Sequence, residues 1–110
     1  MAMMGHNRKK SGLMYAIAFD LGTQTLEQAY GNTSWRNAYA DIRNALRVHG
    51  FDWQQGSVYF GGDNVNAVSC VLAVQDLTRS FAWFRPAVRN MRMLRIEENN
   101  DLGPAIEAAN

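Results

Sequence analysis

The sequence predicts a single α+β domain in which two helices cover one face of a four-stranded antiparallel sheet. Three observations lead to this fold class. The predicted segments follow the order strand, helix, two short strands, helix, strand. Each helical segment carries one apolar stripe, and packing on a sheet is the simplest way to bury it. The chain has 110 residues, of which 47% are hydrophobic, and this suits one core.

The domain is expected to cover residues 14–110, and residues 1–13 are expected to form a flexible, basic extension. Its first strand is predicted at residues 14–20. Apolar side chains occupy both alternating sets of positions there, which is typical of a strand covered on both faces.

A loop is predicted over residues 22–33, because this segment contains two glycines and an asparagine. An amphipathic helix follows, with Thr33 or Ser34 as its N-terminal cap. Its apolar residues recur at intervals of three and four, and Gly50 is expected to end it.

Two short strands, at 51–55 and 57–60, are separated by a glycine that indicates a tight hairpin or bulge. A second amphipathic helix is predicted from residue 65 to about 79, with Asp63 or Asn64 as its cap.

The chain then continues through an aromatic cluster at residues 81–84, expected to close the bottom of the core, into a final strand at 88–96. A short helix, with Asp101 as a candidate cap, is predicted in the tail. Right-handed crossovers favour a split, ferredoxin-like βαββαβ sandwich with the first strand internal. The sheet face without helices then needs a partner, and a two-fold homodimer supplies one.

Basic residues are unevenly distributed along the chain. No acidic residue lies between Asp76 and Glu97, whereas five arginines do: Arg79, Arg85, Arg89, Arg92 and Arg95. Guanidinium groups match pairs of phosphate oxygens, so this pattern is typical of anion binding. It is equally typical of a solvated edge strand that charge protects from aggregation. The sequence leaves both explanations open.

The composition indicates the cellular compartment and the classes of partner that the chain can have. Cys70 is the only cysteine, which excludes an internal disulfide and indicates a reducing, cytoplasmic environment. No apolar run reaches the roughly 18 residues that a membrane-spanning helix needs, so no membrane partner is expected. Charged residues make up 19% of the chain, below the roughly 25% of typical domains, which indicates that a partner covers part of the surface.

No common catalytic motif occurs in the chain. His6 and His49 are expected in the tail and at a helix end, with structural roles. Asp20 closes an otherwise apolar strand, either as a turn residue paired with an arginine or as a base or metal ligand. Ser57 and Asn90 are candidates for contacting a substrate. Taken alone, Ser57 is more often a turn or bulge residue, and the other explanation of Asn90 is a polar side chain at the sheet edge.

Three segments resemble the virulence-associated protein D (VapD) family. They are residues 14–21 (MYAIAFDL), residues 50–59 (GFDWQQGSVY), and the pair at 83–84 followed by residues 88–92 (VRNMR). The similarity runs in order from Met14 almost to the C-terminus. It implies a ferredoxin-like homodimer with toxin-type endoribonuclease activity.

The resemblance also implies roles for individual residues. The family's first-strand aspartate falls on Asp20, the serine of its Q-G-S-V-Y segment on Ser57, and a leucine of the following loop on Leu26. The last-strand V-R-D-I-R motif reads V-R-N-M-R here, so Asn90 replaces an aspartate. Asparagine orients groups but does not accept a proton at neutral pH, which puts catalysis in doubt.

Two hypotheses follow. In the first, the chain is an endoribonuclease for single-stranded RNA or mRNA: Asp20 is the base or a ligand of a divalent metal such as Mg²⁺, Ser57 and Asn90 complete the catalytic set, and Leu26, Arg89 and Arg92 bind RNA. In the second, it is a weak or inactive dimeric module that binds RNA or an antitoxin protein.

Overall fold

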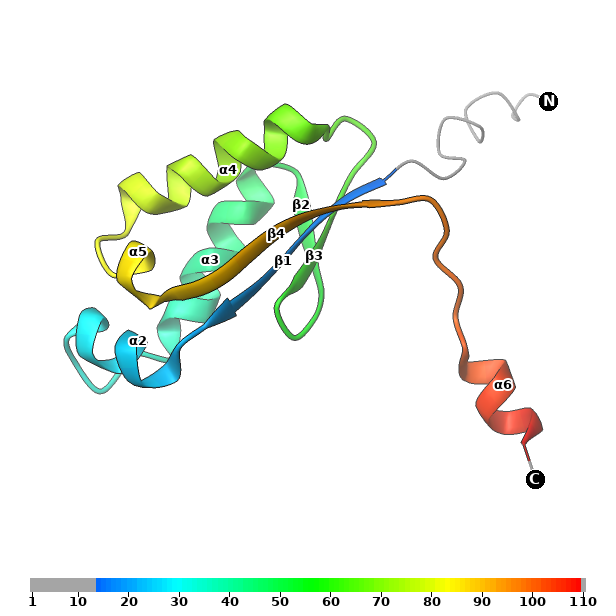
Figure 1. Ribbon diagram of the computed structural model, residues 1–110, viewed down its shortest axis with the longest axis horizontal. Helices are drawn as coiled ribbons and strands as arrows, with labels where there is room; N and C mark the ends of the chain where they lie inside the picture. Colours follow the sequence, from blue (N-terminus) through cyan, green and yellow to red (C-terminus); the bar gives the residue numbers. More distant parts are fainter. Residues whose placement is uncertain (1–13, 110) are drawn as a thin grey trace.

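The computed structural model describes residues 14–109, an α+β fold with one four-stranded antiparallel sheet. The extension predicted over residues 1–13 lies outside the described part. The strands follow the order β2-β3-β1-β4, so β1 is internal, as predicted (Figure 1). The bounds are β1 Met14–Leu21, β2 Phe51–Gln55, β3 Val58–Gly61 and β4 Val88–Ile96.

Within residues 14–109 there are five helices, and their lengths differ widely. Two of them, α3 and α4, are the long amphipathic helices that the sequence predicts. None of the five is long and apolar enough to cross a membrane. The bounds are α2 Thr23–Tyr30, α3 Asn37–Val48, α4 Ala67–Ser80, α5 Phe84–Ala87 and α6 Gly103–Ala108.

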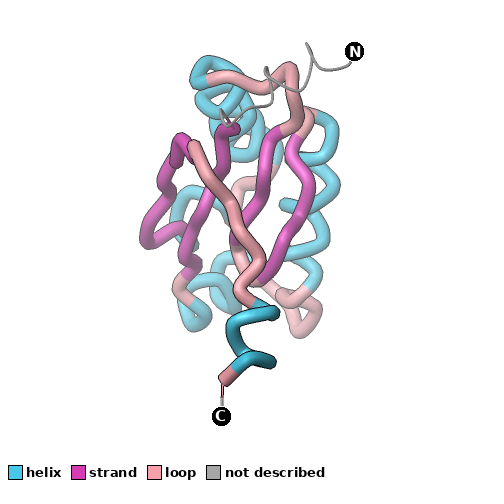
Figure 2. The backbone as a smooth tube through the Cα atoms, turned by 90° about the vertical axis from the view of Figure 1, so that its right-hand side faces the viewer, coloured by secondary structure: helices cyan, strands magenta, loops and turns pink. Residues whose placement is uncertain are grey.

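The core lies between the sheet and the long helices. The four strands lie side by side (Figure 2), α3 packs against β2, α4 packs against β1, and the two helices contact each other. The odd-numbered residues Ile17, Phe19 and Leu21 of β1 belong to the buried cluster. Leu46 and Leu77 of the two helices are fully buried in the same cluster. Burial of these side chains, at about 25 cal/mol per Å² of apolar surface, is what fixes β1 in the centre.

The even-numbered residues of β1 lie on the opposite sheet face. Ala16 stands between its register partners Phe60 on β3 and Leu94 on β4. Ala16 is fully buried, whereas Leu94 is 43% exposed. This sheet face is therefore apolar near its middle and open to solvent at its β4 side.

The predicted loop over residues 22–33 is wrong, because most of it forms helix α2. Leu26 is fully buried, and Tyr30 packs beside it against the core. Gly31 ends the helix in a left-handed conformation, with φ of +87°. The apolar contacts of one short helical face outweigh the weak start signal, since Gly22 offers no capping side chain.

The predicted caps also differ from those observed. Arg36, instead of Thr33 or Ser34, occupies the N-cap position of α3, and Ser34 donates its N–H to the side chain of Asn32 in the preceding turn. Helix α4 is capped by Asn66, whose Oδ1 accepts the N–H of Ser69 at 2.9 Å. The hydroxyl of Ser69 accepts the N–H of Asn66 in return, forming a capping box.

The ends of α3 and α4 are joined by a polar pair. His49, the C-terminal cap of α3, lies 2.8 Å from Asp76 on α4, measured from Nε2 to Oδ2. This hydrogen bond is the main cause that holds the pKa of Asp76 below its ordinary value. His49 thus has the structural role that its position in the sequence predicts.

Candidate active site at the end of the central strand

The candidate site lies where β1 ends. Asp20 is the register partner of Asn90 on β4, and the pairing shifts by a bulge directly after Asp20. Both residues lie on the even-numbered face of the sheet, opposite the helices. A bulge bends a strand and redirects its side chains. The first strand thus presents its one carboxylate at an irregular, accessible point.

Two arginines of β4 lie beside this pair. Arg92 donates from Nε to Oδ1 of Asn90 at 2.9 Å. Arg89 approaches Asp20 with 3.8 Å between Nε and Oδ2, and the two side chains are 70% and 65% exposed. The ion pair is therefore loose and solvated. A shallow hollow of about 290 Å³ opens at this point, lined by Ala18, Phe19, Asp20, Asn90 and Arg92.

Ser57 reaches the same end of the sheet from the other side of β1. Its carbonyl oxygen accepts the N–H of Phe19 at 3.1 Å, so it lies beside the residue that precedes Asp20. Ser57 is half-buried. The β2–β3 turn, the end of β1 and the start of β4 therefore bring Ser57, Asp20 and Asn90 to one end of the sheet.

Leu26 is not part of this cluster of Ser57, Asp20 and Asn90. Its side chain is fully buried among the core residues beneath α2, so no RNA can touch it in this conformation. The direct contact that the resemblance implies does not fit this burial. What Leu26 does here is hold α2 against the rest of the core.

Gly22 is a residue that sequence reasoning missed at this site. A Cβ added to Gly22 would lie 3.1 Å from Cδ of Arg89, closer than side chains normally approach. The N–H of Gly22 donates to the carbonyl of Ala87 at 2.8 Å, which ties the end of β1 to the start of β4. The absent side chain leaves room for Arg89 to lie across the site. The signal in the sequence is a glycine two positions after Asp20.

The side chains around Asp20 do not form a good metal-binding site. Residues 14–109 contain no group of three histidine, cysteine, aspartate or glutamate side chains close enough to hold an ion. Asp20 is the one carboxylate lining the hollow, and Arg89 and Arg92 bring positive charge beside it. Mg²⁺ prefers several oxygen ligands in octahedral geometry. One carboxylate and one engaged amide oxygen do not supply them.

The fold and this cluster define a small α+β protein that presents one accessible carboxylate among arginines. No family model matches the chain. The chain is 52% identical to endoribonuclease VapD 2 of Riemerella anatipestifer, over 84% of this chain and 99% of the relative. It is 52% identical to an endoribonuclease VapD homolog of Helicobacter pylori (86% and 97%) and 38% identical to endoribonuclease VapD of Dichelobacter nodosus (87% and 100%). The chain belongs to the VapD family.

Proposed function

We propose that the chain is an endoribonuclease that cleaves single-stranded RNA, mRNA included, at the end of β1. The observation that carries the proposal is the solvent-accessible carboxylate of Asp20, opposite Asn90 and flanked by Arg89 and Arg92. The relatives named endoribonuclease VapD support the same activity.

The proposed reaction needs a proton acceptor, charge stabilisation and positioning. Asp20 takes the proton of an RNA 2′-hydroxyl, the 2′-oxygen bonds to the adjacent phosphorus, and the bond from phosphorus to the 5′-oxygen breaks. Arg89 and Arg92 offset the negative charge that develops on the phosphate oxygens. The 5′-oxygen leaves with a proton from solvent, and a cyclic phosphate and a 5′-hydroxyl result.

Ser57 and Asn90 have positioning roles in this scheme. The hydroxyl of Ser57 is proposed to bind a phosphate oxygen. The amide of Asn90 orients the substrate or Arg92, to which it is hydrogen-bonded, and does not carry a proton. A divalent metal such as Mg²⁺ would need further oxygens from a second protomer, so none of these steps is assigned to it.

We propose a ferredoxin-like homodimer as the working form. The strand order β2-β3-β1-β4 with antiparallel neighbours supports that fold. The partly exposed apolar side chains of Phe60 and Leu94, on either side of the buried Ala16, support pairing with a second copy. Substitution Phe60→Asp is expected to convert the dimer to a monomer in size-exclusion chromatography with light scattering. A wild-type chain that elutes as a monomer would contradict this part of the proposal.

We also propose that the chain acts as a toxin of a toxin–antitoxin pair in the cytoplasm, with an antitoxin protein as partner. Cys70, a buried free thiol, is compatible with a reducing compartment.

The experiment compares Asp20→Ala with Asp52→Ala. Asp52 is also exposed but lies on the edge strand β2, which β3 separates from β1. Purified proteins are incubated with labelled single-stranded RNA, with and without EDTA, and products are resolved on a gel. We expect cleavage by wild type and Asp52→Ala, no cleavage by Asp20→Ala, and no effect of EDTA. Full activity of Asp20→Ala would refute the assignment. Salt-sensitive RNA retention without product by wild type would favour the binding module instead.

A further inference from the structure

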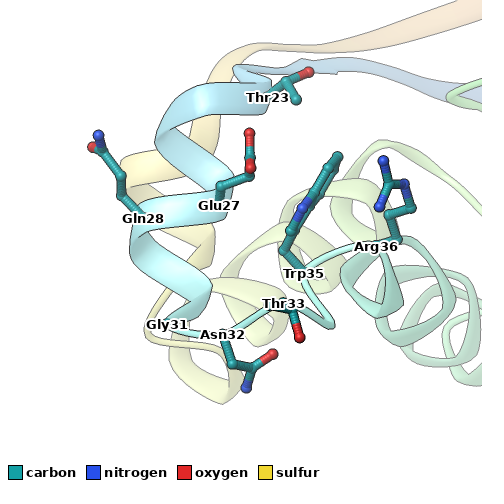
Figure 3. Close-up of a pocket in the computed structure, with 8 residues that line it drawn as sticks. All are labelled: Thr23, Glu27, Gln28, Gly31, Asn32, Thr33, Trp35 and Arg36. Atoms are coloured by element: carbon teal, nitrogen blue, oxygen red, sulfur yellow. The ribbon is translucent and has the colours of Figure 1, made fainter.

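Besides the hollow at Asp20, the surface carries a polar and an apolar concavity. The polar one, of about 820 Å³, lies between α2 and the segment that leads into α3 (Figure 3). The apolar one, of about 270 Å³, lies between α4 and the edge strand β4 and is termed the α4–β4 groove. Water hydrates a polar hollow well, whereas an apolar groove is stabilised when another apolar group covers it.

The α4–β4 groove has an apolar floor and apolar rims. Its floor contains Ile17 and Cys70, which belong to the buried core. Val71 of α4 and Met93 of β4 line it and are about half exposed. No strand covers its outer side, because β4 is the last strand of the sheet. A cavity of roughly 150 Å³ already holds a benzene-sized group, so this groove has room for aliphatic side chains.

The surroundings of the groove define the kind of partner that fits it. The apolar surface continues along α4, where Val68 and Leu72 are exposed within one turn of Val71. A contiguous exposed apolar patch marks an interaction site. The charge beside it is positive, since Arg92 is the one charged residue among those that line the groove, and the exposed Arg95 follows on β4. A partner therefore presents apolar side chains together with negative charge.

The C-terminal segment over residues 97–109 has these complementary properties. Leu102 and Ile106 are 70% and 76% exposed, and their spacing of four places them on one side of α6. The segment contains no basic residue and four acidic ones: Glu97, Glu98, Asp101 and Glu107. Figure 1 shows α6 apart from the sheet, at the end of an extended connection. A single helix as short as α6 is marginal in water, so a docking surface would stabilise it.

We propose that α6 of one copy of this chain docks in the α4–β4 groove of a second copy. Leu102 and Ile106 insert between α4 and β4, and the acidic side chains of the segment lie beside Arg92 and Arg95. In Figure 1 the segment turns away from the α4 of its own chain, which favours a second copy as the receiver. In a two-fold pair each copy gives one segment and receives one, so the contact forms twice.

This contact goes beyond the homodimer face proposed above. The groove is lined by Ile17 and Met93 on the helix side of the sheet, whereas Phe60 and Leu94 lie on the opposite side. Arg92 lines both the groove and the hollow at Asp20. A docked segment therefore borders the candidate active site of the copy that receives it.

Disulfide cross-linking between two distinguishable chains tests the contact. Full-length chains carry Cys70→Ala, so each has only the cysteine that is introduced. One chain carries Ile106→Cys and a hexahistidine tag, and the other carries Val71→Cys without a tag. The two are mixed and mildly oxidised, and the mixed product is identified by mass. A disulfide requires Cα atoms roughly 4.4–6.8 Å apart. The matched control carries Val48→Cys, at an exposed valine that ends α3, in place of Val71→Cys.

The mixed product with Val71→Cys is expected to exceed that of the control at least about tenfold, because docking holds the two positions at roughly millimolar effective concentration. Adding Leu102→Asp to the tagged chain reduces the product to the control level, because an aspartate opposes burial in an apolar groove. Leu102 is exposed, so the substitution leaves the fold intact, and circular dichroism checks every variant.

A second measurement retains Cys70. Sedimentation equilibrium compares wild type with the double variant Leu102→Asp, Ile106→Asp and with the control Val48→Asp. The double variant is expected to self-associate at least about tenfold more weakly, because two apolar side chains lose their burial. The control variant is expected to associate like wild type.

Two results would overturn the proposal. One is a mixed product equal to that of the control, or self-association that the double variant leaves unchanged. The other is a disulfide that closes within a chain carrying both Val71→Cys and Ile106→Cys while no mixed product forms, since the segment then occupies the groove of its own chain. Neither measurement uses RNA, so its result is independent of whether the chain cleaves RNA.

Discussion

The substitution Asn90→Asp tests whether one missing carboxylate limits catalysis. Asn90 faces Asp20 across the β1–β4 pairing and accepts a hydrogen bond from Arg92. The substitution keeps the size of the side chain and adds a group that exchanges protons. A general acid or base typically contributes about 10²–10⁴-fold to a rate. We therefore expect the single-turnover rate of RNA cleavage to rise at least about 100-fold.

The substitution is expected to change stability only slightly. Opposed cross-strand side chains lie roughly 5 Å apart, where two unit charges in water repel by about 0.8 kcal/mol. Asp20 is 65% exposed, so the water-like value applies. The hydrogen bond from Arg92 becomes charge-assisted, which contributes about 1 kcal/mol more than a neutral bond. The two effects nearly cancel, and the Tm should change by less than about 4 °C.

The matched control is Asn44→Asp. The Oδ1 of Asn44 likewise accepts from an arginine, Arg47, at 3.2 Å, but on the exposed surface of α3. Single-turnover cleavage of labelled RNA and thermal unfolding are measured for both variants. An unchanged rate in Asn90→Asp, with the fold intact, would refute the idea that proton transfer at this position limits the chain. An equal gain in Asn44→Asp would show that the added charge acts nonspecifically.

Three further outcomes are expected. The hydrogen bond from His49 is the main cause that lowers the pKa of Asp76 from its ordinary value of 3.8. The pair therefore stabilises the folded protein above about pH 3.8, and this contribution is lost as the pH falls through the lowered pKa. Asp76→Asn therefore lowers the urea midpoint at neutral pH and not in strong acid. Leu26→Ala reduces the free energy of unfolding by about 2–5 kcal/mol in urea titrations, because Leu26 is fully buried. Burial raises the pKa of the Cys70 thiol, so a thiol reagent modifies it only slowly until urea unfolds the protein.

The strands were predictable because their pattern is local. The alternation of arginine with apolar residues gives residues 88–96 as a strand, and β4 has these bounds. The apolar character of residues 14–20 indicates an internal strand, and β1 is internal. In each case the pattern extends over many consecutive positions and agrees with the tertiary structure.

Helix α2 and the helix caps were harder to predict because they depend on contacts distant in sequence. Leu26 gains its burial from residues of other elements, such as Phe84 in the same core cluster. The sequence predicts Asp63 or Asn64 as the cap of α4, whereas the backbone path after β3 places Asn66 there. The residues adjacent to α4 in the sequence do not determine that backbone path.

The sequence predicts which residue types form the candidate site, but it does not predict how their side chains are arranged. An aspartate that ends an apolar strand is visible in the sequence, and the structure leaves Asp20 exposed. The approach of Arg89 across Gly22 depends on the bulge after Asp20, which no residue signals. The burial of Leu26 likewise follows from tertiary packing.

The exposure of Asp20 also makes its substitution interpretable. A solvated ion pair such as Asp20 with Arg89, at 3.8 Å, contributes at most about 1 kcal/mol to stability. Within residues 14–109, no other hydrogen bond or ion pair ties the Asp20 carboxylate to the fold, so folding does not require a charge at this point of β1. Substitution Asp20→Ala should therefore leave the protein folded. A loss of RNA cleavage in that variant would then report on chemistry at the carboxylate and not on unfolding.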